Sequence, residues 1–487
     1  MVRQNIKELN KKFIQKDLTP TKLYQECLQR IDQVEDDLNA FVSVTPEVGL
    51  NQAKESETRY KSDKALSCLD GLPVGIKDVF CTKDIRTTAA SKMLDSFVPP
   101  FDATVVKKLK EAGAVIVGKN NCDAWAHGAS TEHSDFGVTH NPWDLTRVSG
   151  GSSGGSATAV AAGECLYSIG SDTGGSIRQP VAFCGVVGLK PTYGRVSRYG
   201  LIAMGSSLDC VGPIANSTFD IATIMEVIAG YDEKDSTTID IPVPKYSEKL
   251  SNSITGKKIG WVKEFFQMGL ADEIKKTLEE ARRVFEKLGA KFVEVSLPHV
   301  KYSIPAYYII QPAEVSSNLG RYDGIKYGYS AKESQSLIDH YFRSRDEGFG
   351  AEAKRRIMLG TFVLSAGYYD AYYNKAMKVR TLIKKDFDQV LEKVDCILAP
   401  VTPTTAFKIG EKTEDPLQMY LADVFTAPVN LAGHPALSLP SGFNRKKLPI
   451  GMQIIGKYFD EETILNFGHL FEESTKEEKW RDYTTAV

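Results

Sequence analysis

The apolar residues of this chain follow helical spacing in some segments and form continuous runs in others, and the two patterns alternate. Residues 103–119 read ATVVKKLKEAGAVIVGK, where helical spacing ends at Gly113 and an apolar run follows. A helix that ends at a glycine and leads into a buried strand is typical of the connection between parallel strands. The order recurs at 155–170, where a small-residue helix ends at Gly163 before a strand at 166–170. The pattern predicts repeated β-α-β units.

Other segments carry the same two patterns. Thr19-Pro20 has the composition of a helix cap and first turn, so we expect a helix from there to about Asp36. Further helices are predicted over 272–289 and from about Asp460 onward, and ALSLP with IGMQIIG predicts a hairpin. Short strands are predicted at 41–44, 73–77, 186–190, 257–262, 291–297 and 395–399.

Together these elements predict an α/β protein with a large mixed, mostly parallel sheet covered by helices. No linker longer than a few residues divides the chain, so we expect one domain over 1–487. Residues 300–390 are rich in tyrosine and helix-forming residues and predict a helical insertion within that domain.

Charge and composition exclude several classes of protein. Sixty Lys and Arg face 62 Asp and Glu, a formal charge of −2, which argues against strong nucleic-acid binding by this chain alone. The N-terminal segment has no apolar signal core and no run of 18 apolar residues occurs, so no membrane span is expected. Eight cysteines without a Cys-x-x-Cys pair predict no structural metal site and fit a reduced, cytoplasmic protein.

Two stretches rich in glycine and serine carry the candidate chemistry: VSGGSSGGSA at 148–157 and SDTGGSIRQP at 171–180. A flexible linker would be flanked by polar sequence, whereas the first stretch runs into a small-residue helix. A phosphate-binding loop needs a lysine where Ser156 stands, and a nucleophile elbow needs a strand directly before it. The Asp-Thr-Gly triplet of the second stretch has no second copy to form an aspartic-protease dyad.

The second stretch is predicted to lie where a strand ends and a helix begins. The backbone N–H groups of Thr173, Gly174, Gly175 and Ser176 would point together there, as in an oxyanion hole, and Ser176 becomes a candidate nucleophile. None of the seven histidines lies beside a motif that would orient it as a base. A lysine follows the apolar strand in VGIKD, at position 77, and burial would lower its pKa from about 10.4. The alternative is a strand-end lysine that reaches solvent.

The motifs GIKD, GGSSGGSA and GSDTGGSIRQPVAFCGVVGLKPTYGRVS occur in this order and resemble the amidase signature family. The resemblance implies the amidase signature fold and a Ser-cisSer-Lys triad. In that triad Ser176 is the acylated nucleophile, Ser152 follows a cis peptide bond and relays protons, and Lys77 is the base. It also implies an oxyanion hole formed by the backbone of residues 173–176.

The resemblance extends over nearly the whole chain to one branch of that family, the glutaminase (A) subunits of tRNA-dependent amidotransferases. The segments that carry it are STEHSDFGVTHNPWD, KPTYGRVSRYGLIA, SSNLGRYDGIKYG, GFGAEAKRRIMLGTFVLSAGYYDAYYNKAMKVRTLI and APVNLAG. It implies that the chain hydrolyses glutamine and sends ammonia to a B subunit in a heterotrimer completed by a C subunit. The B subunit, with ATP and Mg²⁺, would convert mischarged Glu-tRNA(Gln), Asp-tRNA(Asn) or both. No cofactor is expected in this chain, and mischarged tRNA is expected mainly on the B subunit.

A pocket for free glutamine needs a cation for the α-carboxylate and an anion for the α-ammonium. The resemblance assigns these parts to Arg356, in KRRIMLG, and Asp423, before APVNLAG, with Tyr307 as a further pocket residue. From residue type alone, Arg356 and Asp423 would each be interpreted as an ordinary surface or structural charge. Two other functions stay open: a stand-alone amidase for another small amide, and an inactive interaction subunit that kept the fold. The intact triad residues argue against the second.

Overall fold

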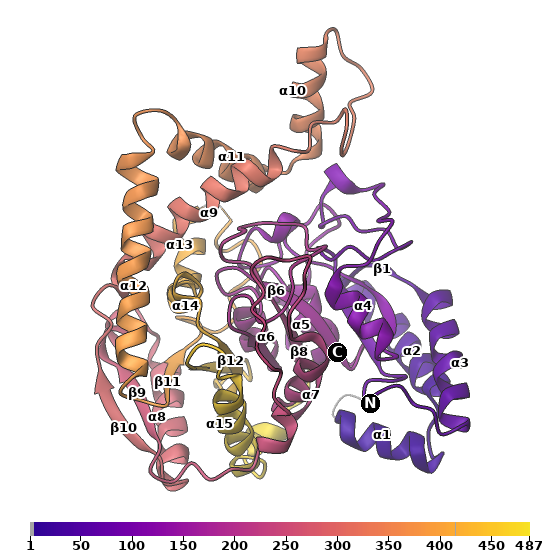
Figure 1. The fold of residues 1–487 in the computed structure, drawn as a ribbon, viewed down its shortest axis with the longest axis vertical. Helices are drawn as coiled ribbons and strands as arrows, with labels where there is room; N and C mark the ends of the chain where they lie inside the picture. The colour runs from indigo at the N-terminus through magenta and orange to yellow at the C-terminus, as the bar shows by residue number, and fades with distance from the viewer. Residues whose placement is uncertain (1–3, 414) are drawn as a thin grey trace.

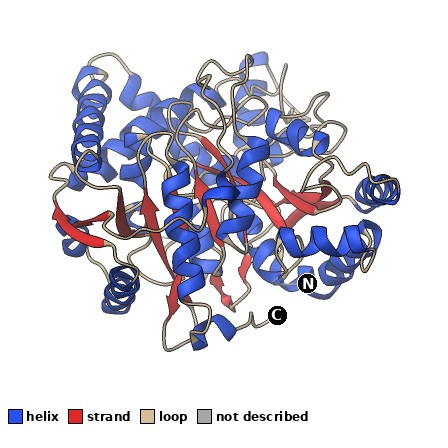
Figure 2. Ribbon diagram, turned by 60° about the horizontal axis from the view of Figure 1, so that its bottom comes forward, coloured by secondary structure: helices blue, strands red, loops and turns tan. Residues whose placement is uncertain are grey.

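The computed structural model describes residues 4–413 and 415–487. Helices cover both faces of a long twisted sheet (Figures 1 and 2). The strands of this sheet are β1 (Phe41–Val44), β2 (Pro73–Lys77), β3 (Val115–Asn120), β6 (Tyr167–Asp172), β7 (Val187–Lys190), β8 (Cys210–Ala215), β9 (Lys258–Val262), β10 (Lys291–Val295), β11 (Cys396–Pro400), β12 (Ala436–Phe443) and β13 (Pro449–Ile455). They lie in the order β1-β3-β2-β6-β8-β7-β12-β13-β11-β9-β10, and a separate hairpin joins β4 (His140–Asn141) to β5 (Asp144–Val148).

The large mixed sheet is confirmed, but its centre differs from the expectation that parallel pairs predominate. Parallel pairing is confined to β2 with β3 and β6, and to β9 with β10 and β11. The strands β8, β7, β12 and β13 pair antiparallel with one another and with their flanking neighbours. Antiparallel neighbours need no crossover helix, so the β-α-β pattern along the chain does not reveal them.

The helices outside the region 300–390 begin and end largely where local sequence places them. Thr19 caps α2 by accepting a hydrogen bond from Lys22 N–H, and Gly163 ends α5 in the left-handed conformation at φ 78°. The helices are α1 (Ile6–Gln15), α2 (Pro20–Leu38), α3 (Pro46–Lys61), α4 (Thr104–Glu111), α5 (Gly154–Ala162), α6 (Arg178–Cys184), α7 (Thr218–Ile228), α8 (Asp272–Lys287), α13 (Pro416–Tyr420), α14 (Ala427–Ala432) and α15 (Glu461–Ser474).

Between β10 and β11 the described chain forms helices and no strand, in the region where we expect a helical insertion. These helices are α9 (Ser303–Leu319), α10 (Leu337–Gly348), α11 (Ala351–Leu364) and α12 (Lys375–Leu391). Figure 1 shows α10 projecting away from the body of the molecule, while α9 and α11 pack against each other. No helix among the described residues combines the length and apolar character needed to cross a membrane.

The neighbouring parallel strands β2 and β6 position the candidate site. Val74 pairs with Tyr167 and Ile76 with Ile169, so both strands end at the same edge of the sheet. Lys77 is the last residue of β2, and β6 ends at Asp172, within the second Gly-Ser stretch. The sheet therefore brings the predicted base and the predicted nucleophile loop to one place.

Candidate active site

Lys77 lies wholly in the protein interior and is surrounded by three serine hydroxyls. Its Nζ lies 2.7 Å from Ser152 Oγ, 2.9 Å from Ser153 Oγ and 2.9 Å from Ser171 Oγ. None of these four residues exposes more than 2% of its surface. Within the described residues Lys77 forms no ion pair with a carboxylate. The lysine is therefore held by neutral groups.

This surrounding favours the neutral amine. Burial lowers the pKa of Lys77 to about 8, against a weaker opposing effect of nearby acidic groups that include Cys122 and Asp123. A neutral amine donates two hydrogen bonds and accepts one. Ser153 Oγ donates its own proton to the Ser171 carbonyl at 3.1 Å, so it accepts from Lys77. The lone pair of Lys77 is then free to receive the proton of the Ser152 hydroxyl.

Ser152 stands in the loop before α5, directly after a cis peptide bond from Gly151. Hydrogen bonds hold this loop on both sides of the serine. Gly151 N–H donates to Gln179 Oε1 at 2.8 Å, and the Ser152 carbonyl accepts from Asp123 N–H at 3.2 Å. A side chain at position 151 would overlap the Asp123 carboxylate, so glycine is required there. These contacts fix Ser152 against Lys77.

Ser176 lies in the loop between β6 and α6, next to the Ser152 loop. Its carbonyl accepts a hydrogen bond from Ser153 N–H at 3.1 Å, which joins the two Gly-Ser stretches directly. With 6% of its surface exposed, Ser176 is the most accessible of the three predicted triad residues. The fold thus brings the loop of Ser176 next to the Lys77–Ser152 pair, where the resemblance places the nucleophile.

The backbone around Ser176 has unused hydrogen-bond donors. The Asp172 carboxylate accepts from Ile177 N–H at 3.1 Å and from Arg178 N–H at 3.3 Å, so it takes up the first amides of the following helix. In the described structure the N–H groups of residues 173–176 donate to no protein group. Gly175 has φ 143°, and a side chain there would overlap Thr426. The free amides of this loop are available to a developing oxyanion.

Arg356, on α11, is 2% exposed and held by two side chains. Its Nε donates to Glu352 Oε1 at 2.8 Å and its Nη1 to Gln311 Oε1 at 2.7 Å. Burial disfavours the guanidinium charge, but Glu352 together with the neighbouring tyrosines outweighs burial and raises the pKa of Arg356. The guanidinium also lies over the rings of Tyr308 and Tyr420, 5.4 and 5.6 Å from their centroids. This is a fixed, buried cation.

Asp423, at the end of the 3₁₀ helix η7 (Leu421–Asp423), contacts the hydroxyl of Tyr308. Its Oδ2 accepts a hydrogen bond from Tyr308 Oη at 2.8 Å, and burial raises its pKa to about 7. Because Tyr308 contacts both Asp423 and Arg356, the two predicted pocket charges lie near each other although they are distant in sequence.

Tyr307 connects this pair of charges to the serine loop. Its ring lies against Gly174, where an added side chain would overlap it. Thr426 makes a second connection, since its Oγ1 donates to the Gly174 carbonyl at 2.6 Å and its N–H to the Asp423 carbonyl at 3.1 Å. Asp423 is therefore linked to the loop that carries Ser176, and Arg356 is linked to Asp423 through Tyr308.

Sequence reasoning missed four groups in this site: Ser153, Ser171, Tyr308 and Glu352. Ser153 follows Ser152 in the same Gly-Ser stretch, and Ser171 is the first residue of the second stretch, so proximity in sequence is the available signal for both. Glu352 stands four residues before Arg356, the helical spacing of an ion pair. Nothing along the chain singles out Tyr308 rather than Tyr307.

No histidine ring of the described residues hydrogen-bonds to Ser152 or Ser176, and these residues contain no group of three or more His, Cys, Asp or Glu side chains that could hold a metal ion. Lys77 is the basic side chain that touches a serine hydroxyl at this site.

A buried lysine between paired serine loops, beside free backbone amides, defines a serine hydrolase site without a histidine. The sequence profile of the Amidase family matches residues 22–465. The chain therefore belongs to the amidase family, which confirms the resemblance seen in the sequence.

Several relatives within this family are named as the A subunit of glutamyl-tRNA(Gln) amidotransferase. The chain is 56% identical over 475 residues to that protein from Carboxydothermus hydrogenoformans and 54% identical over 476 residues to that from Geotalea daltonii, covering 98% of each chain in both cases. The crystal structure of the corresponding protein from Thermotoga maritima is 43% identical, with a TM-score of 0.80, 97% of this chain and 96% of that chain covered. A peptide amidase from Stenotrophomonas maltophilia is 28% identical with a TM-score of 0.83, and 97% of each chain is covered.

Proposed function

We propose that this chain is the glutamine-hydrolysing subunit of a tRNA-dependent amidotransferase. The observation that carries the proposal is the 2.7 Å contact between the buried Lys77 amine and the Ser152 hydroxyl, next to the loop of Ser176. The identity of more than 50% to amidotransferase A subunits, over nearly the full chain, supports the particular reaction.

Acylation uses the three side chains in sequence. Ser176 Oγ attacks the side-chain amide carbon of glutamine while its proton passes to Ser152, and the Ser152 proton passes to neutral Lys77. The free amides of residues 173–176 hold the oxyanion. When the intermediate collapses, the C–N bond breaks, the leaving nitrogen takes a proton back along the same relay, and ammonia departs. A γ-glutamyl ester of Ser176 remains.

Deacylation repeats the relay with water. Water adds to the ester carbonyl and gives a proton to the relay, and Ser176 Oγ recovers a proton as the ester bond breaks. Glutamate leaves, and Lys77 returns to the neutral form. Each proton released in one step is consumed in the next, so the cycle yields one glutamate and one ammonia for each glutamine and water.

The charges beside the serine loop suit glutamine. We assign Arg356 to the α-carboxylate and Asp423 to the α-ammonium, with Tyr307 forming the wall between them and Gly174. The support is their common contact with Tyr308 and the link of Asp423 to the loop through Thr426. A simple amide that lacks the α-carboxylate and the α-ammonium would use neither of these charges.

The remaining steps belong to partner subunits in this proposal. Ammonia passes to a B subunit, which binds the mischarged tRNA and uses ATP and Mg²⁺ to activate its carboxylate, and a C subunit completes the heterotrimer. The names of the relatives, which designate them as one subunit of an amidotransferase, support such an assembly. The near-neutral charge of this chain supports placing the tRNA mainly on the partner. Eight cysteines without a Cys-x-x-Cys pair support a reducing, cytoplasmic setting.

A stand-alone amidase is the second candidate, favoured by the structural likeness to the Stenotrophomonas maltophilia peptide amidase. Reconstitution decides between the two. The chain should copurify with a B-like and a C-like subunit, and the complex should convert Glu-tRNA(Gln), Asp-tRNA(Asn) or both with glutamine as the nitrogen donor. A solitary chain that is fully active on other amides, and a complex that is inactive with glutamine, would support the stand-alone enzyme.

A further inference from the structure

The carboxylate of Asp123 is fully buried beside the Ser152 loop and accepts several hydrogen bonds. Its Oδ2 accepts from Thr131 N–H at 2.9 Å and Ser130 N–H at 3.3 Å. Its Oδ1 accepts from His133 N–H at 3.2 Å and lies 3.1 Å from His133 Nδ1. A carboxylate only accepts, so Nδ1 of His133 carries the proton of this bond. The backbone N–H of Asp123 donates in turn to the Ser152 carbonyl.

The segment organised by Asp123 also holds the loop on either side of Ser152. Thr131 Oγ1 donates to the Gly150 carbonyl at 2.8 Å and accepts from Gly154 N–H at 3.2 Å. These bonds depend on the position of Thr131, which the Asp123 carboxylate fixes through the Thr131 amide. The network therefore contacts the loop before, at and after the relay serine.

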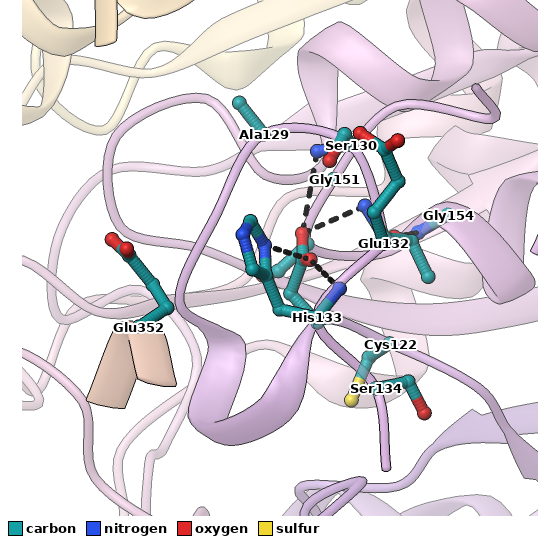
Figure 3. A network of polar contacts seen from close by, with 12 residues as sticks. Cys122, Ala129, Ser130, Glu132, His133, Ser134, Gly151, Gly154 and Glu352 are labelled. Carbon is teal, nitrogen blue, oxygen red and sulfur yellow. Dashed lines mark hydrogen bonds and ion pairs between the residues drawn. The ribbon is translucent and has the colours of Figure 1, made fainter. Parts of the chain in front are cut away.

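His133 reaches from this network to the substrate pocket. A small cavity is lined by His133, Glu352, Arg356 and Tyr308, among others. Figure 3 shows Glu352 across the His133 ring from the dashed bonds to the Asp123 carboxylate. Burial disfavours the imidazolium, but Asp123 and Glu352 outweigh burial and the opposing charge of Arg356, and they raise the pKa of His133. The His133 ring thus lies between the carboxylate of Asp123, beside the Ser152 loop, and the carboxylate of Glu352, beside Arg356.

We propose that Asp123 and His133 are positioning residues for Ser152, and that His133 ties the Ser152 loop to the Glu352–Arg356 end of the pocket. The inference rests on the proposed amide hydrolysis. Neither residue touches the reacting atoms. Their effect is on the separation of the Ser152 hydroxyl from Lys77, because proton transfer through a relay falls steeply when its hydrogen bonds lengthen.

Four variants test the proposal by steady-state glutamine hydrolysis with the full chain in its active complex. In Asp123→Asn the amide nitrogen cannot accept the bonds that one carboxylate oxygen accepts, and in His133→Ala the ring bond is lost. Both should lower kcat at least tenfold with KM within threefold of wild type. His133→Asn places an amide N–H near the position of Nδ1 and should keep kcat within threefold. The exposed Asp135→Asn, in the same segment but away from the Ser152 loop, is the matched control.

The split between kcat and KM, and the rescue by asparagine, separate positioning from a structural role. Unchanged kcat in His133→Ala would overturn the proposal, as would an equal loss in His133→Asn and His133→Ala, or a rise in KM alone. Thermal unfolding identifies a variant that does not fold. If Asp123→Asn does not fold, the two His133 variants test the proposal. The His133 side chain is 26% exposed, so its replacement disturbs the interior less. A wild type inactive on glutamine contradicts the proposed function instead, and the comparison is then made with the amide it does hydrolyse.

Discussion

Lys77 Nζ lies 2.7 Å from Ser152 Oγ, and neither side chain is exposed to solvent. The lysine comes from the end of β2 and the serine from a loop 75 positions later. No carboxylate pairs with Lys77 in the described structure, so burial outweighs the weaker effect of nearby acidic groups and favours the neutral amine. The contact therefore supports Lys77 as the base and Ser152 as the group through which it works.

Replacing the lysine tests this division of roles. Lys77→Ala should lower the rate of acylation by about 10²–10⁴-fold, the usual contribution of a positioned base. Lys77→Arg should not restore it, because arginine stays protonated at any working pH. Single-turnover hydrolysis of glutamine measures the step directly, with the exposed Lys107→Ala as a control. Turnover near wild type in Lys77→Arg would remove Lys77 from the base role.

The pH dependence should follow the same amine. Only the neutral form accepts a proton, and the pKa of Lys77 is lowered to about 8. The value of kcat/KM for glutamine should therefore rise as pH increases toward 8 and level off above about pH 9. Initial rates between pH 6 and 9.5 at constant ionic strength give the profile. A value of kcat/KM that falls across pH 7–9 contradicts a lysine base.

Ser176→Ala separates the two halves of the proposed reaction. Without the nucleophile, hydrolysis of glutamine and glutamine-dependent transamidation should both fall to background. Transamidation supplied with ammonium should largely survive, because the acyl-tRNA chemistry is assigned to the partner. Product formation from labelled mischarged tRNA measures both routes on one preparation. Equal loss of the ammonium-dependent route would show that the division of labour is wrong.

Local sequence predicts the individual elements well and their order in the sheet poorly. The cap at Thr19, the stop at Gly163 and the hairpin of β12 and β13 are each determined by residues close in sequence, and all are confirmed. The antiparallel pairing of β7 with β8 and β12 depends on contacts across the whole chain. Such neighbours leave no periodic pattern, so the sequence overestimates the extent of parallel pairing.

The site divides in the same way. Lys77 and the Gly-Ser loops have unusual local sequence, an amine at the end of an apolar strand and glycines before a packed helix. The hydroxyl of Ser171 and the ring of Tyr308 are ordinary in sequence and acquire a role only through the fold. Ser171 reaches Lys77 because β2 and β6 are neighbours, and Tyr308 bridges two charges supplied by other segments.

The buried guanidinium tests recognition of the α-carboxylate. Arg356 uses Nε and Nη1 for Glu352 and Gln311, and within the described residues its Nη2 donates no hydrogen bond. Arg356→Lys keeps the charge but cannot keep both bonds and still present a donor, so KM for glutamine should rise about tenfold. Steady-state kinetics measures it, with Arg343→Lys on the projecting helix α10 as a control. An unchanged KM would place the carboxylate elsewhere.

The prediction for Asp423 is the most demanding one. It depends both on whether the carboxylate is ionised and on whether it binds the α-ammonium of glutamine. Burial raises its pKa to about 7, and only the ionised carboxylate pairs well with an α-ammonium. In the wild type KM for glutamine should therefore fall as pH rises from 6 to 8. Asp423→Asn should raise KM about ten- to a hundredfold, the value of a hydrogen bond to a charged group, while ammonium-dependent transamidation stays intact.

The asparagine variant should also lose the pH dependence of KM, since the titrating group is gone. The exposed Asp346→Asn serves as the matched control for removing one acidic charge. Measuring KM at pH 6, 7 and 8 for the wild type, Asp423→Asn and Asp346→Asn distinguishes two explanations for weaker binding of glutamine. A structural disturbance raises KM but leaves its pH dependence, whereas loss of the ammonium partner removes both the affinity and the dependence. A KM in Asp423→Asn that is unchanged at every pH would mean that other residues bind the α-ammonium, even with the Lys77–Ser152–Ser176 assignment intact.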